Sequence, residues 1–174
     1  MRHFTFLVLL GLFIGTQAVN LTDLLEALNT TEKTWLKKRT YNVSDHTCVY
    51  TLKCELNETY YEFDQGYKTA HTIVNHTLYS KLGENDTAGP WMKVSNTSAV
   101  THGLMYFLQY WNTSEKCGIL KVRLFDQDQY EMHQWNSTVE EEKSACTNTY
   151  NELVGGNHSY EIYSNSCRSG DNTY

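Results

Sequence analysis

Residues 117–146 read CGILKVRLFDQDQYEMHQWNSTVEEEKSAC, and this stretch says most about the fold. Two cysteines enclose two strand-like runs, the turn between them and the start of a helical segment. A disulfide across this interval would join strand, turn, strand and helix into one rigid unit able to hold a pocket open. Glu131 stands in the second run between aromatic residues. A carboxylate in that setting indicates a binding site, provided that Glu131 faces inward.

The rest of the chain continues the pattern of an antiparallel sheet. Runs rich in Tyr, Val, Thr, Leu and Trp are separated by polar turns at hairpin spacing, which is typical of an up-and-down sheet. Turn-forming residues coincide with glycosylation sequons at 56–58, 83–86 and 112–114. We predict eight strands, near residues 34–41, 47–54, 59–67, 70–80, 91–95, 104–111, 116–125 and 130–136.

Two helices flank these strands. The first is predicted from leucines at helical spacing, with Asn20 or Thr22 available as its cap: Leu21, Leu24, Leu25 and Leu28. The second begins at a capping box of Thr138 and Glu141 and stops at Gly155 and Gly156. Its inner face would hold Val139, Cys146, Tyr150 and Leu153, and its solvated side residues 140–143.

These elements predict a mostly β chain, folded as an eight-stranded antiparallel up-and-down barrel with a short N-terminal helix and a C-terminal helix packed outside. Such a barrel has room for one small ligand and leaves no sheet edge open. A final extended segment at 159–164 leads to Cys167. A filled β-sandwich without a cavity is an alternative that strand count does not exclude.

The N-terminus has the features of a secretory signal. Arg2 precedes an apolar run at 4–14, and Thr16, Gln17 and Ala18 fit a cleavage site. We therefore expect a signal peptide at 1–18, a single domain at 19–174, and a secreted, extracellular product. The apolar run is too short to span a bilayer, and no later segment reaches the ~20 residues of a membrane helix.

Asparagine sequons are unusually frequent, because ten of the fourteen asparagines precede x-Ser or x-Thr. Chance would supply about two or three, so heavy N-glycosylation is predicted for a secreted chain. Occupied sites must face solvent. The ten positions are Asn20, Asn29, Asn42, Asn57, Asn75, Asn85, Asn96, Asn112, Asn136 and Asn157.

Five cysteines in an oxidising compartment predict two disulfides and one remaining thiol. Five choices of odd cysteine with three pairings each leave fifteen arrangements. If Cys48 and Cys54 share one extended strand, their Cα atoms are ~20 Å apart and cannot form a disulfide, which needs ~6 Å. For an odd cysteine, a buried thiol, a covalent dimer contact and a displaced pairing all stay open.

Charge and motifs exclude several classes of function. Without Arg2 the chain has 13 basic and 20 acidic residues, a formal charge of 13 − 20 = −7, so nucleic acid is not an expected partner. His71 and His76 would lie on opposite faces of a strand and make a poor metal pair. No phosphate loop or Cys-x-x-Cys is present. We expect no catalytic residues, no metal and no cofactor.

Taken together, these features resemble the tick salivary lipocalins, which include histamine-binding and serotonin-binding proteins. The resemblance covers the mature chain and rests on the leading helix, Cys48 with Val49 and Tyr50, Cys117 with Ile119, the pair Tyr130 and Glu131, and Cys146. It implies the disulfides Cys48–Cys167 and Cys117–Cys146, with Cys54 unpaired. It also implies a monomeric carrier, for which Cys54 is a possible dimer contact.

The sequence departs from the amine-binding members at three positions. Gly118 stands where they have an acid, Met132 where they have Leu, and His133 where they have Trp or Tyr. The Met change is mild. An amine enters as an ammonium, which needs a carboxylate and aromatic faces in a dry barrel. Glu131 supplies the charge, while a protonated His133 would repel the amine.

The implied disulfide also predicts which side chains face inward. If Cys117 points toward the helix, then Gly118, Leu120, Val122 and Leu124 point into the barrel. The neighbouring strand would contribute Leu104, Tyr106, Leu108 and Tyr110. The predicted ligand contacts are Glu131, Trp135, His133, Tyr106, Leu108 and Gly118.

Three functional hypotheses follow. The first, which the resemblance implies, is capture of a host biogenic amine such as histamine or serotonin, to blunt inflammation at a feeding site. The second is capture of a lipid mediator such as a leukotriene, which suits the apolar interior. The third is a protein-binding inhibitor that uses the barrel as a scaffold, although ten glycans would leave little bare surface for an interface.

Overall fold

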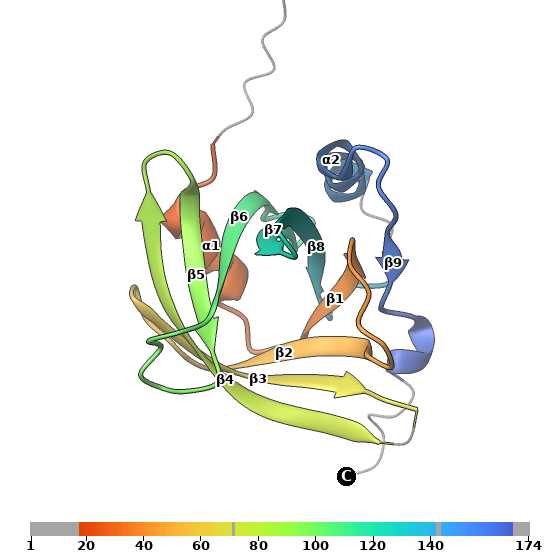
Figure 1. Cartoon of the computed structure of the whole chain (residues 1–174). Helices are drawn as coiled ribbons and strands as arrows, with labels where there is room; N and C mark the ends of the chain where they lie inside the picture. Colours follow the sequence, from red (N-terminus) through yellow and green to blue (C-terminus); the bar gives the residue numbers. More distant parts are fainter. Residues whose placement is uncertain (1–17, 71, 142–143, 169–174) are drawn as a thin grey trace, which may run out of the picture.

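The computed structural model describes residues 18–70, 72–141 and 144–168. The strands follow one another around a ring, as Figure 1 shows. The eight strands of the ring are β1 (Thr34–Arg39), β2 (Thr47–Leu56), β3 (Tyr60–Lys68), β4 (Ile73–Asn85), β5 (Gly89–Ser95), β6 (Leu104–Asn112), β7 (Cys117–Leu124) and β8 (Gln127–Trp135).

The ring is closed because β1 pairs with both β8 and β2, all antiparallel. The register of β1 against β8 shifts between Leu36 and Lys38, and this irregularity lets the short strand β1 pair with both neighbours. The closed eight-stranded barrel is the predicted architecture, and it rules out the sandwich. A two-residue strand, β9 (Tyr160–Glu161), adds to the outer edge of β1.

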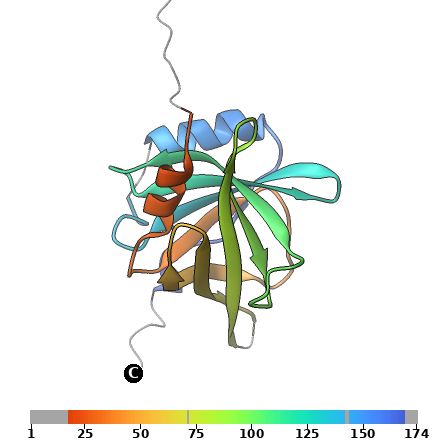
Figure 2. The same cartoon turned by 90° about the vertical axis from the view of Figure 1, so that its left-hand side faces the viewer.

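Helix α1 (Leu21–Leu28) covers one end of the barrel, and α2 (Ser144–Val154) lies outside it, as Figures 1 and 2 show. Asn20, not Thr22, caps α1: its side-chain oxygen accepts from the backbone N–H groups of Thr22 and Asp23. Leu24 of α1 is buried against Tyr61, Phe63 and neighbouring residues of the barrel core.

The predicted start of the second helix is wrong. Thr138 and Glu141 form a turn, and α2 begins at Ser144. The hydroxyl of Thr138 donates to the carbonyl of Glu115, and its oxygen accepts from Nε2 of Gln134 and not from a backbone N–H at a helix start. The carboxylate of Glu115 instead accepts from the N–H groups of Ala145 and Cys146, a cap supplied from another loop that local sequence does not reveal.

The predicted inner face of this helix is correct for Cys146, Tyr150 and Leu153, which belong to the cluster between α2 and the barrel, and wrong for Val139. Val139 precedes α2 and packs with Trp35 and Cys48, whereas Val154 is the buried residue near the end of α2. Glu140 and Glu141 precede the helix, and residues 142–143 lie outside the described ranges.

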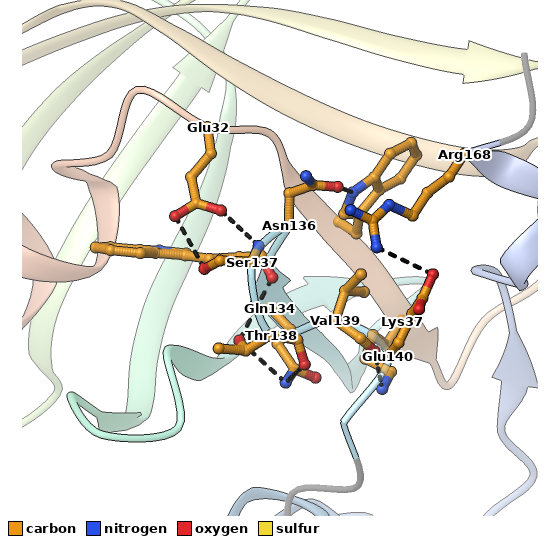
Figure 3. A network of polar contacts seen from close by, with 11 residues as sticks. Glu32, Lys37, Gln134, Asn136, Ser137, Thr138, Val139, Glu140 and Arg168 are labelled. Atoms are coloured by element: carbon orange, nitrogen blue, oxygen red, sulfur yellow. Dashed lines mark hydrogen bonds and ion pairs between the residues drawn. The ribbon is translucent and has the colours of Figure 1, made fainter. Parts of the chain in front are cut away.

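Polar contacts hold the segment after β8 against the start of β1 (Figure 3). Glu32 accepts from the backbone and hydroxyl of Ser137, and Asn136 accepts from the indole N–H of Trp35 at 2.8 Å. Further along the segment, the ammonium of Lys37 donates to the carbonyl of Val139. This network closes the barrel beside the C-terminal segment.

The turn predicted at 83–86 is also displaced, because β4 continues to Asn85. Gly83 is needed within the strand: a Cβ there would lie 2.4 Å from the Trp91 ring on the neighbouring strand. Similarly, β8 begins at Gln127 and not at 130. The connection from β7 is the pair Phe125 and Asp126, both with positive φ, as a tight two-residue hairpin requires.

Both disulfides implied by the resemblance are present. Cys48 is bonded to Cys167, and Cys117 to Cys146. Cys54 is an exposed free thiol, so the reading of a buried thiol is wrong.

Candidate functional site

Two adjoining cavities occupy the barrel. The outer one has a volume of about 490 Å³ and the inner one about 60 Å³. The outer volume is in the range of small-molecule sites. The residues that line both cavities form a partition between them: Thr34, Thr51, Phe63, Met92, Leu120 and His133.

All six predicted contact residues line one or both cavities. Glu131 and Tyr106 line the outer cavity, and His133 lines both. Trp135, Leu108 and Gly118 line the inner cavity. Glu131 and Trp135 share the inward face of β8, but their separation along the strand places the acid and its predicted aromatic partner in different chambers.

Glu131 is a buried carboxylate with two donors from the chain. The hydroxyl of Tyr41 donates to Oε1, and Nε2 of His133 lies 2.8 Å from Oε2. An ionised carboxylate only accepts, so the Nε2 atom of His133 carries the proton in this contact. The side chain of Glu131 points inward, as the sequence predicts, but its partners fix it in place.

The pKa of Glu131 reflects these partners. Burial by itself would raise it, but the hydrogen bond and charge of His133, the hydroxyl of Tyr41 and the charge of Arg39 together lower the pKa below its ordinary value. Burial and the nearby Glu131 raise the pKa of Tyr41 and of Tyr106, so both phenols stay protonated. The cavity therefore contains the carboxylate of Glu131 together with the guanidinium of Arg39 and two neutral phenols.

Arg39 is a site residue that the sequence did not single out. It pairs across the sheet with Glu131, is 4 % exposed and lines the outer cavity. Its Nη2 donates to the carbonyls of Val43 and His46, while its Nε is buried without a hydrogen-bond partner in the described structure. In the sequence Arg39 ends a basic run with Lys37 and Lys38, which reads as an exposed strand end. The cross-strand register is the signal that would have found it.

The segment 40–46 between β1 and β2 contributes to the wall of the outer cavity. Tyr41, Asn42, Val43 and His46 all line it. His46 stacks on Tyr67 with ring centroids 3.9 Å apart, and burial together with Arg39 lowers the pKa of His46. Two apolar side chains, Leu104 and Phe125, line the same cavity and are 46 % and 83 % exposed.

The inner cavity is aromatic. Trp111 and Trp135 lie with ring centroids 5.8 Å apart, and the indole N–H of Trp135 donates to the carbonyl of Ala27 at the end of α1. A Cβ at Gly118 would lie 3.3 Å from the ring of Trp111. The glycine thus stands where amine binders are expected to have an acid because Trp111 occupies the adjacent space.

The predicted inward face of β6 is correct only in its first half. Leu104, Tyr106 and Leu108 line the cavities, but a register shift between Leu108 and Tyr110 reverses the alternation. Tyr110 consequently packs with the cluster under α2, and Trp111 faces inward. Such a bulge changes which residues face the core without a clear mark in sequence.

The sequons occupy mostly outward positions. Eight of the ten asparagines are exposed, while Asn112 and Asn136 are half-buried. Asn112 donates to the hydroxyl of Tyr110, and Asn136 accepts from Trp35. Their glycosylation stays a prediction, as does the signal peptide, of which residues 1–17 lie outside the described ranges.

The part of the chain that the structure describes contains neither a metal-binding cluster nor a membrane-spanning helix. No group of three or more His, Cys, Asp or Glu side chains is arranged to hold a metal ion there. None of the helices in this part has the length and apolar character needed to cross a membrane. His71 is not described, and His76 is exposed.

Comparison with protein families gives one match. The family model described as tick histamine binding protein covers residues 16–169 of the 174-residue chain. Comparison with curated protein sequences gives no match.

Solved structures share the fold at low sequence identity. The serotonin complex of AM182 is 17 % identical with a TM-score of 0.64, covering 83 % of this chain and 91 % of its own. Japanin from Rhipicephalus appendiculatus, bound to cholesterol, is 12 % identical with a TM-score of 0.60, covering 81 % and 98 %. The siderocalin Ex-FABP is 9 % identical with a TM-score of 0.58, covering 80 % and 95 %. At these identities the likeness establishes the fold.

Proposed function

We propose that this chain, which belongs to the tick histamine-binding protein family, is a secreted carrier that sequesters a small host amine such as histamine or serotonin in its outer cavity. Family membership and the ligand-binding neighbours support small-ligand capture. The two disulfides fit an extracellular, oxidising compartment. Capture would require no bond making or breaking.

The observation that carries the amine proposal is the charge on Glu131. Its side chain is 6 % exposed and its pKa is held below the ordinary value, so the carboxylate is ionised inside a largely apolar chamber. A buried charge is costly unless it is paired, and a ligand ammonium would add a charge-assisted hydrogen bond. The phenol ring of Tyr106 lines the same cavity and offers a face to a cation.

Calorimetric titration of the purified, glycosylated protein with histamine and with serotonin tests this proposal. Glu131→Gln should lose at least about 1.5 kcal/mol of binding free energy with the best amine, because it removes the charge and keeps the shape. The exposed Glu152→Gln on α2 is the matched control and should bind as the wild type does. Heats equal to dilution for both amines would contradict the proposal.

Arg39 favours a second candidate, an acidic amphipathic lipid mediator such as a leukotriene. Its buried Nε has no partner in the described structure, and a carboxylate head group would supply an acceptor. The surrounding wall is apolar enough for an acyl chain, with Leu36, Val49, Leu78 and Val94 among its residues.

Displacement of a fluorescent fatty acid distinguishes this candidate from the amine. Wild-type protein should bind the probe, Arg39→Gln should bind it at least about tenfold more weakly, and the exposed Arg123→Gln should not differ from the wild type. Organic extraction of the native protein should also release a lipid. Absence of both probe binding and extractable lipid would exclude the acidic ligand.

A further inference from the structure

The amine proposal depends on the carboxylate of Glu131, which already accepts a hydrogen bond from the hydroxyl of Tyr41. This hydroxyl donates to Oε1 of Glu131, while His133 donates to Oε2 at 2.8 Å. Each oxygen therefore has a donor from the protein itself. An ionised carboxylate has about four acceptor sites, so a ligand that reaches Glu131 either uses a lone pair beside these donors or replaces one of the two donors.

The two donors differ in how firmly the backbone holds them. His133 belongs to β8 and is paired on both sides, with Leu36 of β1 and Gly118 of β7. Tyr41 lies beyond the end of β1, in the segment that leads to β2. Its predecessor Thr40 is fixed to β8, since its hydroxyl contacts Gln129 at 2.6 Å and the N–H of Tyr130 at 2.9 Å.

This arrangement makes the side chain of Tyr41 the donor that can leave. The anchor at Thr40 keeps the backbone next to Glu131, but no strand pairing of Tyr41 has to break when its side chain rotates away. In the empty cavity the phenol stabilises a carboxylate that would otherwise be short of donors. Its ring also lies over the guanidinium of Arg39, 5.1 Å from ring centroid to Cζ.

An ammonium is the chemical group suited to replace this phenol. It brings a full charge and three donors, so its hydrogen bond to a carboxylate is stronger than that of a neutral hydroxyl. A neutral ligand of the same shape would gain no such advantage, because it would exchange one neutral donor for another. The need to displace the phenol of Tyr41 therefore favours charged ligands over neutral ones.

We propose that Tyr41 is a specificity-determining residue, an internal cap on Glu131 that a ligand's primary ammonium must displace. The bond of a cationic ligand to Glu131 is strong enough to offset the free energy of moving the phenol. A neutral analogue forms a weaker bond and leaves the phenol in place. This inference rests on the proposed capture of an amine at Glu131 and names a residue that opposes it.

Calorimetric titration of Tyr41→Phe with histamine and serotonin tests the cap. The variant should bind amines at least about fivefold more tightly, on the scale of a hydrogen bond to a charged group, because the ligand no longer competes with the phenol. The affinity for tryptophol, a neutral analogue of an indole amine, should change less between the wild type and the variant. The gain should vanish in the double variant Tyr41→Phe with Glu131→Gln.

Tyr130→Phe is the matched control. Tyr130 neighbours Glu131 along β8 but packs with the cluster under α2, so loss of its hydroxyl should leave amine binding unchanged. Tyr41→Leu removes the phenol in a second way, and thermal unfolding checks that each variant is folded.

The outcomes separate the cap from the proposed function. If the wild type binds an amine and the folded Tyr41 variants bind it equally or more weakly, the cap is wrong and amine capture stands. If neither the wild type nor the variants bind either amine, both are overturned. Binding that appears only when the hydroxyl is removed supports the cap directly.

Discussion

The hairpin of β7 and β8 presents two faces to different surroundings. On one face Cys117, Ile119 and Met132 pack against Cys146 and Tyr150 of α2, all at most 2 % exposed. On the other face Glu131, His133 and Leu120 line the cavities. Adjacent residues along one strand thus belong to a tightly packed layer and to an open chamber. The packed face keeps the strands in place so that the other face can stay unfilled.

One of the two largest expected effects comes from removing the disulfide that joins the packed face to α2. The double variant Cys117→Ser with Cys146→Ser should lose about 2–4 kcal/mol of unfolding free energy, because the disulfide closes a 29-residue interval and constrains the unfolded chain. Urea unfolding measures the loss. Cys54→Ser, at an exposed free thiol, should stay within about 0.5 kcal/mol of the wild type.

The two faces can be compared directly at neighbouring positions of β7. Ile119→Ala should cost about 3–4 kcal/mol, because it opens a new cavity beneath α2. Leu120→Ala should cost about 1–2 kcal/mol, since Leu120 already borders empty space and loses fewer contacts. Urea unfolding under identical conditions gives both values. Equal losses would show that the cavity side is packed as densely as the helix side.

The helix that covers the packed face depends on a distant cap. Glu115→Ala should lower the unfolding free energy by about 1 kcal/mol, the usual value of an N-terminal cap, because its carboxylate accepts from two N–H groups at the start of α2. Chemical denaturation checks the value. Glu152→Ala, exposed on the same helix, is the control, and a loss as large as that of Glu115→Ala would argue against capping.

The last prediction concerns Glu131 on the cavity face, whose contribution to the unfolding free energy changes with pH in the acid range. Because the folded-state pKa of Glu131 is lowered, the carboxylate contributes stability that is fully present above its unfolded pKa of about 4.3. This stability is lost as pH falls through the lower folded pKa. Glu131→Gln should therefore flatten the acid limb of unfolding free energy against pH.

Urea unfolding from pH 3 to pH 7 measures this slope. The exposed Asp126→Asn controls for the loss of one negative charge. An unchanged slope in Glu131→Gln would mean that the buried carboxylate is not held ionised by Tyr41 and His133.

Much of the fold was predictable because it depends on local patterns. Runs rich in strand-forming residues between polar turns located all eight strands, and leucine spacing located α1. Strand alternation counted from Cys117 correctly placed Gly118, Leu120 and Leu124 on the cavity side of β7. The prediction failed where a bulge interrupted the alternation at Tyr110, and at the start of α2, where the cap is Glu115, 30 residues before Ala145.

The site was predictable in part. Glu131 was found because an acid among aromatics is unusual in a strand, and its neighbours on β8 followed from alternation. Arg39 and Tyr41 were missed, since their proximity to Glu131 arises from the pairing of β1 with β8, about ninety residues apart in the chain. Local sequence contains no trace of that register.

By itself, the sequence determined the barrel, its leading helix and the presence of an acid in the eighth strand, because each depends on the type and spacing of nearby residues. Only the tertiary structure decided what surrounds that acid. Closure of the ring brings β1 against β8, which places Tyr41 on one carboxylate oxygen and Arg39 nearby, while Trp135 moves to a separate chamber. The surroundings of the acid therefore depend on contacts between segments that are distant in sequence.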